Sequence, residues 1–139
     1  MDNDNLHRVF VYGSLKSGGD IRGLNQFDGA NIVAKAKTKF PDYNMLDLGS
    51  FPGVTKNGEK HIQGEVWEVD DEVMEQLDAI EGYPTFYDRE LTQTTQGKAW
   101  MYFLDSQDYN DLSIAVNTRN SQHIEEVDNT LIWTNKTYY

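Results

Sequence analysis

The sequence predicts an α+β fold with one clear helix and a mixed, mostly antiparallel sheet or small β-barrel. Many short segments rich in β-branched and aromatic residues are separated by turn signals, which favours strands. Only the stretch that ends at residue 81 has a clear helical period of apolar residues. With 139 residues, we expect a single domain over residues 1–139, whose clearest patterns lie at about 8–104 and whose segment 105–139 gives weaker signals.

Composition and charge narrow the classes of partner. The 12 basic and 23 acidic residues give a net charge of −11, which argues against nucleic acid or an anionic membrane as a partner. The absence of cysteine excludes disulfides and thiolate chemistry. Residues 1–5 lack the pattern of a signal peptide, and no apolar run reaches membrane-spanning length, so we expect a cytoplasmic protein.

The first predicted strand covers residues 8–12 and breaks into a glycine-bearing turn over residues 13–19. Backbone N–H groups in such a turn lack strand partners, so they can bind an anion or an oxyanion. The turn is not a P-loop, because Gly19 and Asp20 stand where that motif has lysine and serine or threonine. It also lacks the Gly-x-Ser-x-Gly pattern of a serine hydrolase, so Ser14 is better explained as a turn residue than as a nucleophile.

The middle of the chain adds further strands and turns. Residues 30–40 alternate weakly and predict a strand, with residues 43–48 as its hairpin partner. Residues 51–54 predict a loop, and residues 61–69 predict a half-buried strand. Between the first two strands, residues 21–27 predict a short turn or helix.

A helix is predicted from a cap at Asp70 or Asp71 to Glu81, and Gly82 ends it. At 100° per residue its apolar residues share one face, made of Val73, Met74, Leu77 and Ile80. Glu81 falls within that apolar arc, at the helix end whose dipole disfavours anions. Burial there and the acidic neighbours should raise the pKa of Glu81, which makes it the leading functional candidate. The alternative is a carboxylate that turns outward where the helix frays.

Two more strands are predicted at residues 86–95 and 98–104. The signal weakens after them. Residues 108–117 fit a helix or an irregular segment, and residues 124–134 fit a final short helix or strand.

Three groups of residues, in this order along the chain, resemble motifs of the γ-glutamylcyclotransferase-like family, which includes the AIG2-like plant proteins and the γ-glutamylamine cyclotransferases. They are the strand-turn Tyr12-Gly13-Ser14-Leu15-Lys16, the helix end Leu77-Asp78-Ala79-Ile80-Glu81-Gly82, and the following Tyr87-Asp88-Arg89. Phe51-Pro52-Gly53-Val54 and residues 64–69 resemble further pieces of the family pattern. The resemblance covers roughly residues 9–103.

The resemblance implies a small β-barrel with flanking helices and a cavity at its mouth. It implies that turn amides hold the γ-glutamyl group of a small-molecule substrate, with Tyr12, Gly13, Ser14 and Leu15 as binding residues. It implies Glu81 as the general acid/base for release of 5-oxoproline and a free amine or amino acid by intramolecular attack of the α-amine. Tyr87 is a further candidate for substrate binding or, with Arg89, one of an outward-facing strand pair, and we expect Arg89 to be mainly structural.

Such a reaction requires no metal and no organic cofactor. The three histidines, His7, His61 and His123, are isolated and lack ligand spacing, so no metal site is predicted. The alternative function is a non-catalytic module that keeps the cavity for a small ligand or a protein. Both a monomer and a homodimer are compatible with the sequence.

Overall fold

The computed structural model describes residues 6–13, 28–48, 51–56, 58–104 and 123–134. One helix, α1 (Asp71–Glu81), lies in this part of the chain. The strands are β1 (His7–Val11), β2 (Ala30–Lys37), β3 (Tyr43–Asp47), β4 (Pro52–Lys56), β5 (His61–Val69), β6 (Asp88–Thr94), β7 (Gly97–Phe103), β8 (Ile124–Val127) and β9 (Thr130–Trp133). The predicted segments 21–27 and 108–117 lie outside the described residues.

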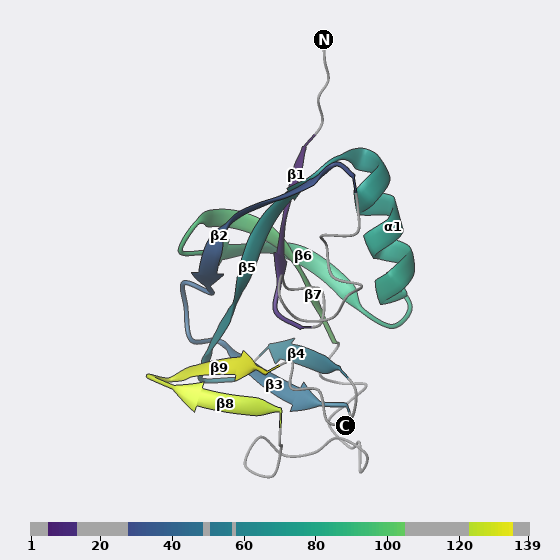
Figure 1. Ribbon diagram of the computed structural model, residues 1–139. Coiled ribbons are helices and arrows are strands. Elements are labelled where there is room, and N and C mark those ends of the chain that lie inside the picture. Colours follow the sequence, from purple (N-terminus) through teal and green to yellow (C-terminus); the bar gives the residue numbers. More distant parts are fainter. Residues whose placement is uncertain (1–5, 14–27, 49–50, 57, 105–122, 135–139) are drawn as a thin grey trace, which may run out of the picture.

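The main sheet has the strand order β6-β7-β1-β5-β9-β8, with β2 also paired to β5 (Figure 1). Most pairs are antiparallel, whereas β1 runs parallel to β7 and β5 runs parallel to β9. The sheet curls so that β2 and β6 approach each other, and Lys39 N donates to Gln93 O over 2.9 Å beyond the end of β2. The predicted α+β fold with a mixed, mostly antiparallel sheet is therefore confirmed, as a curled half-barrel.

A second, two-stranded sheet is formed by β3 and β4. Two predictions are wrong here: β3 does not pair with β2, and the predicted loop at residues 51–54 contains the start of β4. The partner of β2 is instead β5, a pairing distant in sequence that packing decides and local turn signals do not show. Pro52 is compatible with β4 because it is the first residue of the strand, where a missing N–H is tolerated.

The end of the described chain is a hairpin of β8 and β9, so residues 124–134 form strands rather than a helix. Asp128 and Asn129 join them with positive φ angles of 51° and 58°, which is typical of a two-residue type I′ turn. The hairpin attaches to the main sheet through β9, which pairs with the first residues of β5.

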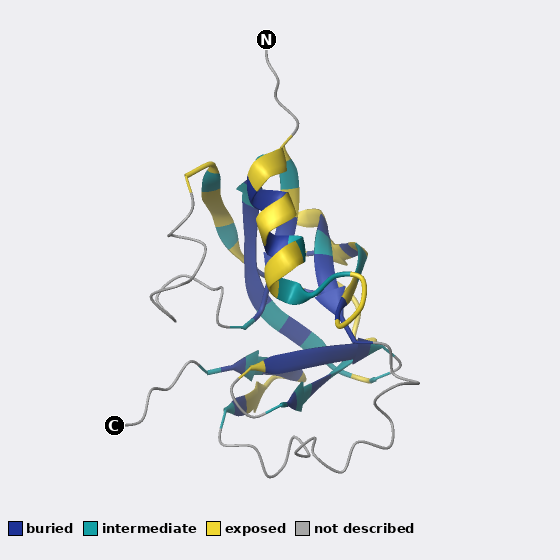
Figure 2. Ribbon diagram, turned by 90° about the vertical axis from the view of Figure 1, so that its right-hand side faces the viewer, coloured by how far each residue is buried: buried dark blue, intermediate teal, exposed yellow. Residues whose placement is uncertain are grey.

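Helix α1 has the predicted ends. The Asp70 carboxylate accepts from Val73 N over 2.9 Å, and Gly82 closes the helix with a φ of 67° in the left-handed region. The buried helix residues are Val73, Met74 and Leu77, and Figure 2 shows this face turned to the sheet with the exposed face outward. The expectation that Ile80 joins the buried face is wrong, since it is 55% exposed in the last turn.

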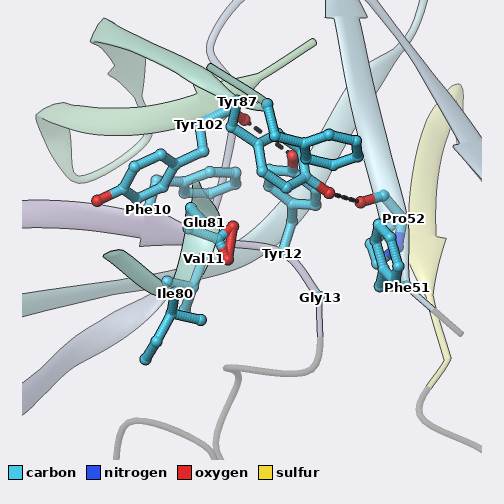
Figure 3. Close-up of a pocket in the computed structure, with 11 residues that line it drawn as sticks. Phe10, Val11, Tyr12, Gly13, Phe51, Pro52, Ile80, Glu81, Tyr87 and Tyr102 are labelled. Atoms are coloured by element: carbon cyan, nitrogen blue, oxygen red, sulfur yellow. Dashed lines mark hydrogen bonds between the residues drawn. The ribbon is translucent and has the colours of Figure 1, made fainter. Parts of the chain in front are cut away.

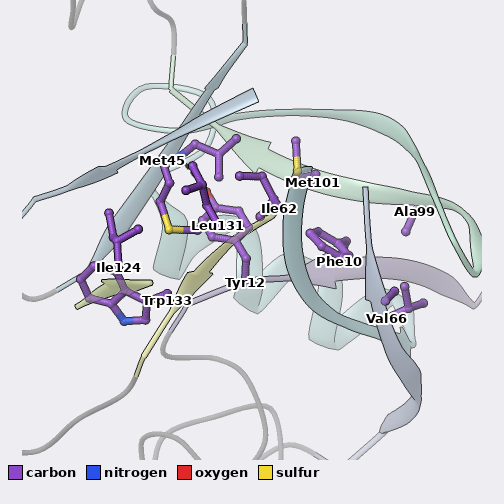
Figure 4. Close-up of a cluster of buried hydrophobic side chains, with 12 residues drawn as sticks. Phe10, Tyr12, Met45, Ile62, Val66, Ala99, Met101, Ile124, Leu131 and Trp133 are labelled. Carbon is purple, nitrogen blue, oxygen red and sulfur yellow. Dashed lines mark hydrogen bonds between the residues drawn. The ribbon is translucent and has the colours of Figure 1, made fainter. Parts of the chain in front are cut away.

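The two faces of β1 separate two clusters of buried side chains. Phe10 and Tyr12 belong to the cluster drawn in Figure 4, with members from β3, β5, β7 and the β8–β9 hairpin. Val9 and Val11 face the other cluster, which holds the buried residues of α1. Because β1 is fixed from both sides, its carboxyl end, where Tyr12 and Gly13 lie, is held in place.

Candidate active site

A pocket of about 300 Å³ lies where the end of β1, the start of β4 and the last turn of α1 meet (Figure 3). This volume is at the small end of the range of about 300–1,000 Å³ for small-molecule sites. The pocket is lined by Phe10, Val11, Tyr12, Gly13, Phe51, Pro52, Ile80, Glu81, Phe86, Tyr87 and Tyr102. Among these lining residues, which belong to the described part of the chain, Glu81 is the only one with a carboxyl or a basic group.

Glu81 is the last residue of α1, and it lines the pocket. The residue as a whole keeps some contact with solvent, but burial of its carboxyl raises its pKa to about 7. The physical cause is the loss of hydration of the charged form, and not the acidic neighbours along the helix that the sequence suggested. A carboxyl with this pKa can both accept and donate a proton near neutral pH.

Tyr12 and Tyr87 line the pocket with their rings while their hydroxyls bind backbone. The Tyr12 hydroxyl donates to Tyr102 O over 2.8 Å and accepts from Val54 N over 3.3 Å. The Tyr87 hydroxyl donates to Pro52 O over 2.6 Å. Burial raises the pKa of Tyr12 further above its ordinary value, so this phenol stays protonated. These two tyrosines therefore tie β1, β4 and β7 together around the pocket.

Gly13 forms the part of the wall that adjoins β4. A Cβ atom at this position would lie 2.9 Å from Cγ and Cδ of Pro52. Such an approach is closer than carbon atoms normally allow, so only glycine fits without a shift of the wall. Glycine at the end of β1 thus lets the backbone come close to β4 and leaves its peptide group next to the cavity.

The last turn of α1 is attached to the sheet through Asp78. Arg89 donates to its two carboxylate oxygens over 2.9 and 3.1 Å, and the Tyr102 hydroxyl donates to Oδ1 over 2.7 Å. The Arg89 guanidinium also lies 4.5 Å from the ring centroids of both Tyr83 and Trp100. Burial, together with the Asp78 carboxylate, raises the pKa of Tyr102. This network agrees with the structural role expected for Arg89, and it fixes the helix end that carries Glu81.

The structure brings four of the six candidate residues to one pocket, namely Tyr12, Gly13, Glu81 and Tyr87. Ser14 and Leu15 lie outside the described residues. Tyr87 is only 5% exposed, so it does not belong to an outward-facing strand pair. Sequence reasoning missed Tyr102, although its place on β7 follows from the strand alternation.

The described part of the pocket offers a group suited to proton transfer. The lining residues include no described serine, cysteine or histidine that could act as a nucleophile. Within the described part of the chain, no group of three His, Asp or Glu side chains is placed to hold a metal ion. In the described lining, one carboxyl of near-neutral pKa, that of Glu81, lies among apolar and aromatic walls and next to the backbone at Gly13.

The curled sheet is similar to the fold of solved AIG2-like structures. An AIG2-like protein from Mus musculus has a TM-score of 0.64 at 20% identity, covering 86% of this chain and 92% of that chain. The solution structure of ytfP from Escherichia coli has a TM-score of 0.53 at 33% identity, covering 70% and 81%.

The chain belongs to the family described as gamma-glutamyl cyclotransferase, AIG2-like, whose model matches residues 9–123. A Vibrio cholerae protein that provisionally carries the name gamma-glutamylcyclotransferase is 38% identical over 96 residues, which are 69% of this chain and 80% of the relative. The gamma-glutamylcyclotransferase family protein YtfP of Escherichia coli is 36% identical over 96 residues, which are 68% and 80%. The family resemblance in the sequence is thereby confirmed. In the described residues, no helix is long and apolar enough to cross a membrane.

Proposed function

We propose that this protein is a cofactor-independent γ-glutamyl cyclotransferase, and that Glu81 is its general acid/base. Membership of the family supports an enzyme of this type. The observation that carries the proposal is the Glu81 carboxyl, whose pKa is about 7 and which shares a pocket with Gly13 at the end of β1. A γ-glutamyl compound provides both reacting groups, so the pocket has only to fold the substrate and move protons.

In the proposed reaction, the α-amine nitrogen of the γ-glutamyl group attacks its own γ-carbonyl carbon. A C–N bond forms and closes the five-membered ring of 5-oxoproline. The attacking ammonium has to lose two protons to become the ring N–H. Ionised Glu81 takes one of them as the nitrogen attacks and delivers it to the departing nitrogen as the original C–N bond breaks. It passes the second proton in the same way, so the amine departs as an ammonium and Glu81 ends ionised. Protons and atoms balance without water or a co-reactant, and the products are 5-oxoproline and a free amine or amino acid.

Besides proton transfer, the reaction requires that the substrate be bound and its oxyanion stabilised, and we assign these tasks to backbone N–H groups and aromatic rings. The oxyanion on the γ-carbonyl and the substrate α-carboxylate both require N–H donors. We assign these contacts to the turn that begins at Gly13 and includes Ser14 and Leu15, because such turns present unpaired N–H groups. Tyr12 and Tyr87 contact the substrate with their rings in this proposal, since their hydroxyls already bind backbone.

The test is the release of 5-oxoproline by the purified protein from a panel of γ-glutamyl amines, amino acids and peptides, followed by mass spectrometry. We expect Glu81→Gln to abolish release without lowering the melting temperature. Glu75→Gln is the matched control, because Glu75 lies on the same helix but is exposed and does not line the pocket. No 5-oxoproline from any compound, or full activity of Glu81→Gln, would contradict the proposal.

A further inference from the structure

The lining of the pocket divides into a buried floor and an exposed mouth. The floor residues are at most 6% exposed and comprise Phe10, Val11, Tyr12, Tyr87 and Tyr102. Three large apolar side chains are exposed at the mouth: Ile80 at 55%, Phe51 at 38% and Phe86 at 38%. Exposed apolar side chains grouped at a cavity, rather than scattered, indicate a surface that a ligand covers.

The two phenylalanines of the mouth form an ordered aromatic series with Tyr87. Phe51 meets Phe86 edge to face, with ring centroids 6.1 Å apart, and Phe86 meets Tyr87 edge to face at 4.9 Å. Phe86 is placed by the end of α1, because its N–H donates to Gly82 O over 2.7 Å. The series therefore leads from Phe51 at the mouth to Tyr87 in the floor, and its middle ring, Phe86, lies beside the helix end that carries Glu81.

The described lining of the pocket offers no positive charge to a carboxylate on the leaving group. No lysine or arginine is among its lining residues, as far as the described chain extends. Arg89 binds Asp78 between two aromatic rings. Lys56 pairs with Glu90 over 3.0 Å and lies 4.4 Å from the Phe103 ring centroid. A leaving group with its own carboxylate would meet ionised Glu81 in a protein whose net charge is −11.

We propose that Phe51, Phe86 and Ile80 select γ-glutamyl amides whose leaving amine carries an uncharged apolar group, aromatic in the preferred case. This inference rests on the proposed cyclotransferase function. Glu81 has to reach the departing nitrogen, and Ile80 lines the same pocket at its exposed mouth. The substituent on that nitrogen consequently leaves the floor beside Ile80 and packs on the two phenylalanine rings, where an aromatic group gains edge-to-face contacts.

The test compares kcat/KM for four compounds that differ only in the leaving amine: γ-glutamyl-benzylamine, γ-glutamyl-ethylamine, γ-glutamyl-phenylalanine and γ-glutamyl-1,4-diaminobutane. We expect the benzylamine compound to exceed each of the others by about tenfold or more, the scale of discrimination by an apolar pocket. Phe86→Ala and Phe51→Ala should each remove most of this preference. Phe40→Ala is the matched control, because Phe40 is 49% exposed but does not line the pocket.

Binding of the same four compounds to Glu81→Gln by calorimetry separates this inference from the proposed function. If no compound yields 5-oxoproline but the benzylamine compound binds most tightly and loses affinity in Phe86→Ala, the cyclotransferase proposal fails and the selection by the mouth stands. If 5-oxoproline forms with equal efficiency from all four compounds, the function stands and the selection is wrong. Preference for the phenylalanine or diaminobutane compound, or a Phe86→Ala variant with unchanged preference, also overturns it.

Discussion

At the residue scale, Glu81 is a helix-end carboxyl whose pKa is well above the ordinary value for glutamate. Glu81 is the last residue of α1. The sequence alone could place it on the apolar helix face, but it could not decide whether the carboxyl is buried or turns outward where the helix frays. The pocket decides between them, because walls from β1 and from the turn after α1 remove water from the carboxyl and raise its pKa to about 7. Those walls come from segments about 70 residues apart, which no local pattern reveals.

The raised pKa of Glu81 has a consequence for stability. Below pH 4.5 the carboxyl is protonated in both states, while between pH 4.5 and 7 it ionises in the unfolded chain only, which lowers the free energy of unfolding as the pH rises. We expect Glu81→Gln to gain stability relative to the wild type across this interval, by at most about 3 kcal/mol at pH 8. Urea denaturation of both proteins at pH 4.5, 6 and 8 checks this. A difference between them that does not change with pH would contradict it.

The close approach of Gly13 to Pro52 predicts that a larger residue at position 13 destabilises the protein. A methyl group there would approach the Pro52 ring to 2.9 Å, so Gly13→Ala should lower the free energy of unfolding by about 1–3 kcal/mol. The double variant with Pro52→Ala removes the ring and should restore part of this loss, which a double-mutant cycle in urea measures. Additive losses would show that the contact is not the cause.

At the element scale, the end of α1 is held to the sheet by one residue network. Asp78 binds Arg89 and Tyr102, so the turn of helix that precedes Glu81 is attached to both β6 and β7. The sequence predicted the helix with its cap and its end, because capping and period are local signals. It did not predict the partners of Asp78, because β6 and β7 meet the helix only in the folded sheet.

We expect Arg89→Met to lower the free energy of unfolding by about 1–3 kcal/mol, because two charge-assisted hydrogen bonds to a partly buried carboxylate are lost. In the proposed enzyme, kcat/KM should fall about tenfold or more, because Glu81 is no longer held in position. The control is Lys56→Met, whose exposed ion pair with Glu90 should contribute less than about 1 kcal/mol. Equal losses for the two variants would contradict the special role of Arg89.

The prediction errors at the scale of the elements have one cause, which is that the strand pairs and contacts are decided by segments distant in sequence. Adjacent segments suggested a hairpin of residues 30–40 with 43–48, but β2 pairs with β5 and β3 pairs with β4. The start of β4 was predicted as a loop because proline and glycine are typical of turns. Pro52 is tolerated as the first strand residue, and Gly53 is packed against the Leu104 side chain, a contact distant in sequence.

At the scale of the whole molecule, the α+β fold was predictable because many short strands and one amphipathic helix leave few arrangements of this size. The position of the pocket was not, since it depends on how the sheet curls and on where β4 crosses the end of β1. The family motifs supplied that information indirectly, because Tyr12, Gly13, Glu81 and Tyr87 are matched in order along the chain and line one cavity.

The net charge of −11 should make the stability of the whole molecule depend on salt. Repulsion among the acidic groups opposes the compact state, and salt screens it as the Debye length falls from about 30 Å at 0.01 M to about 8 Å at 0.15 M. We expect the melting temperature at pH 8 to rise by roughly 2–5 °C between 0.01 and 0.15 M sodium chloride. A melting temperature that falls or stays constant would show that local ion pairs outweigh the net charge.

The pH dependence of kcat/KM for 5-oxoproline release tests the central claim, that one buried carboxyl moves both protons. Because kcat/KM reports the ionisation of the free enzyme, the profile should rise with pH and level off with an apparent pKa near 7, the pKa of Glu81. This limb should be absent from any residual activity of Glu81→Gln. A profile that is flat through pH 7, or one whose inflection persists in Glu81→Gln, would contradict the assignment of Glu81 as the acid/base.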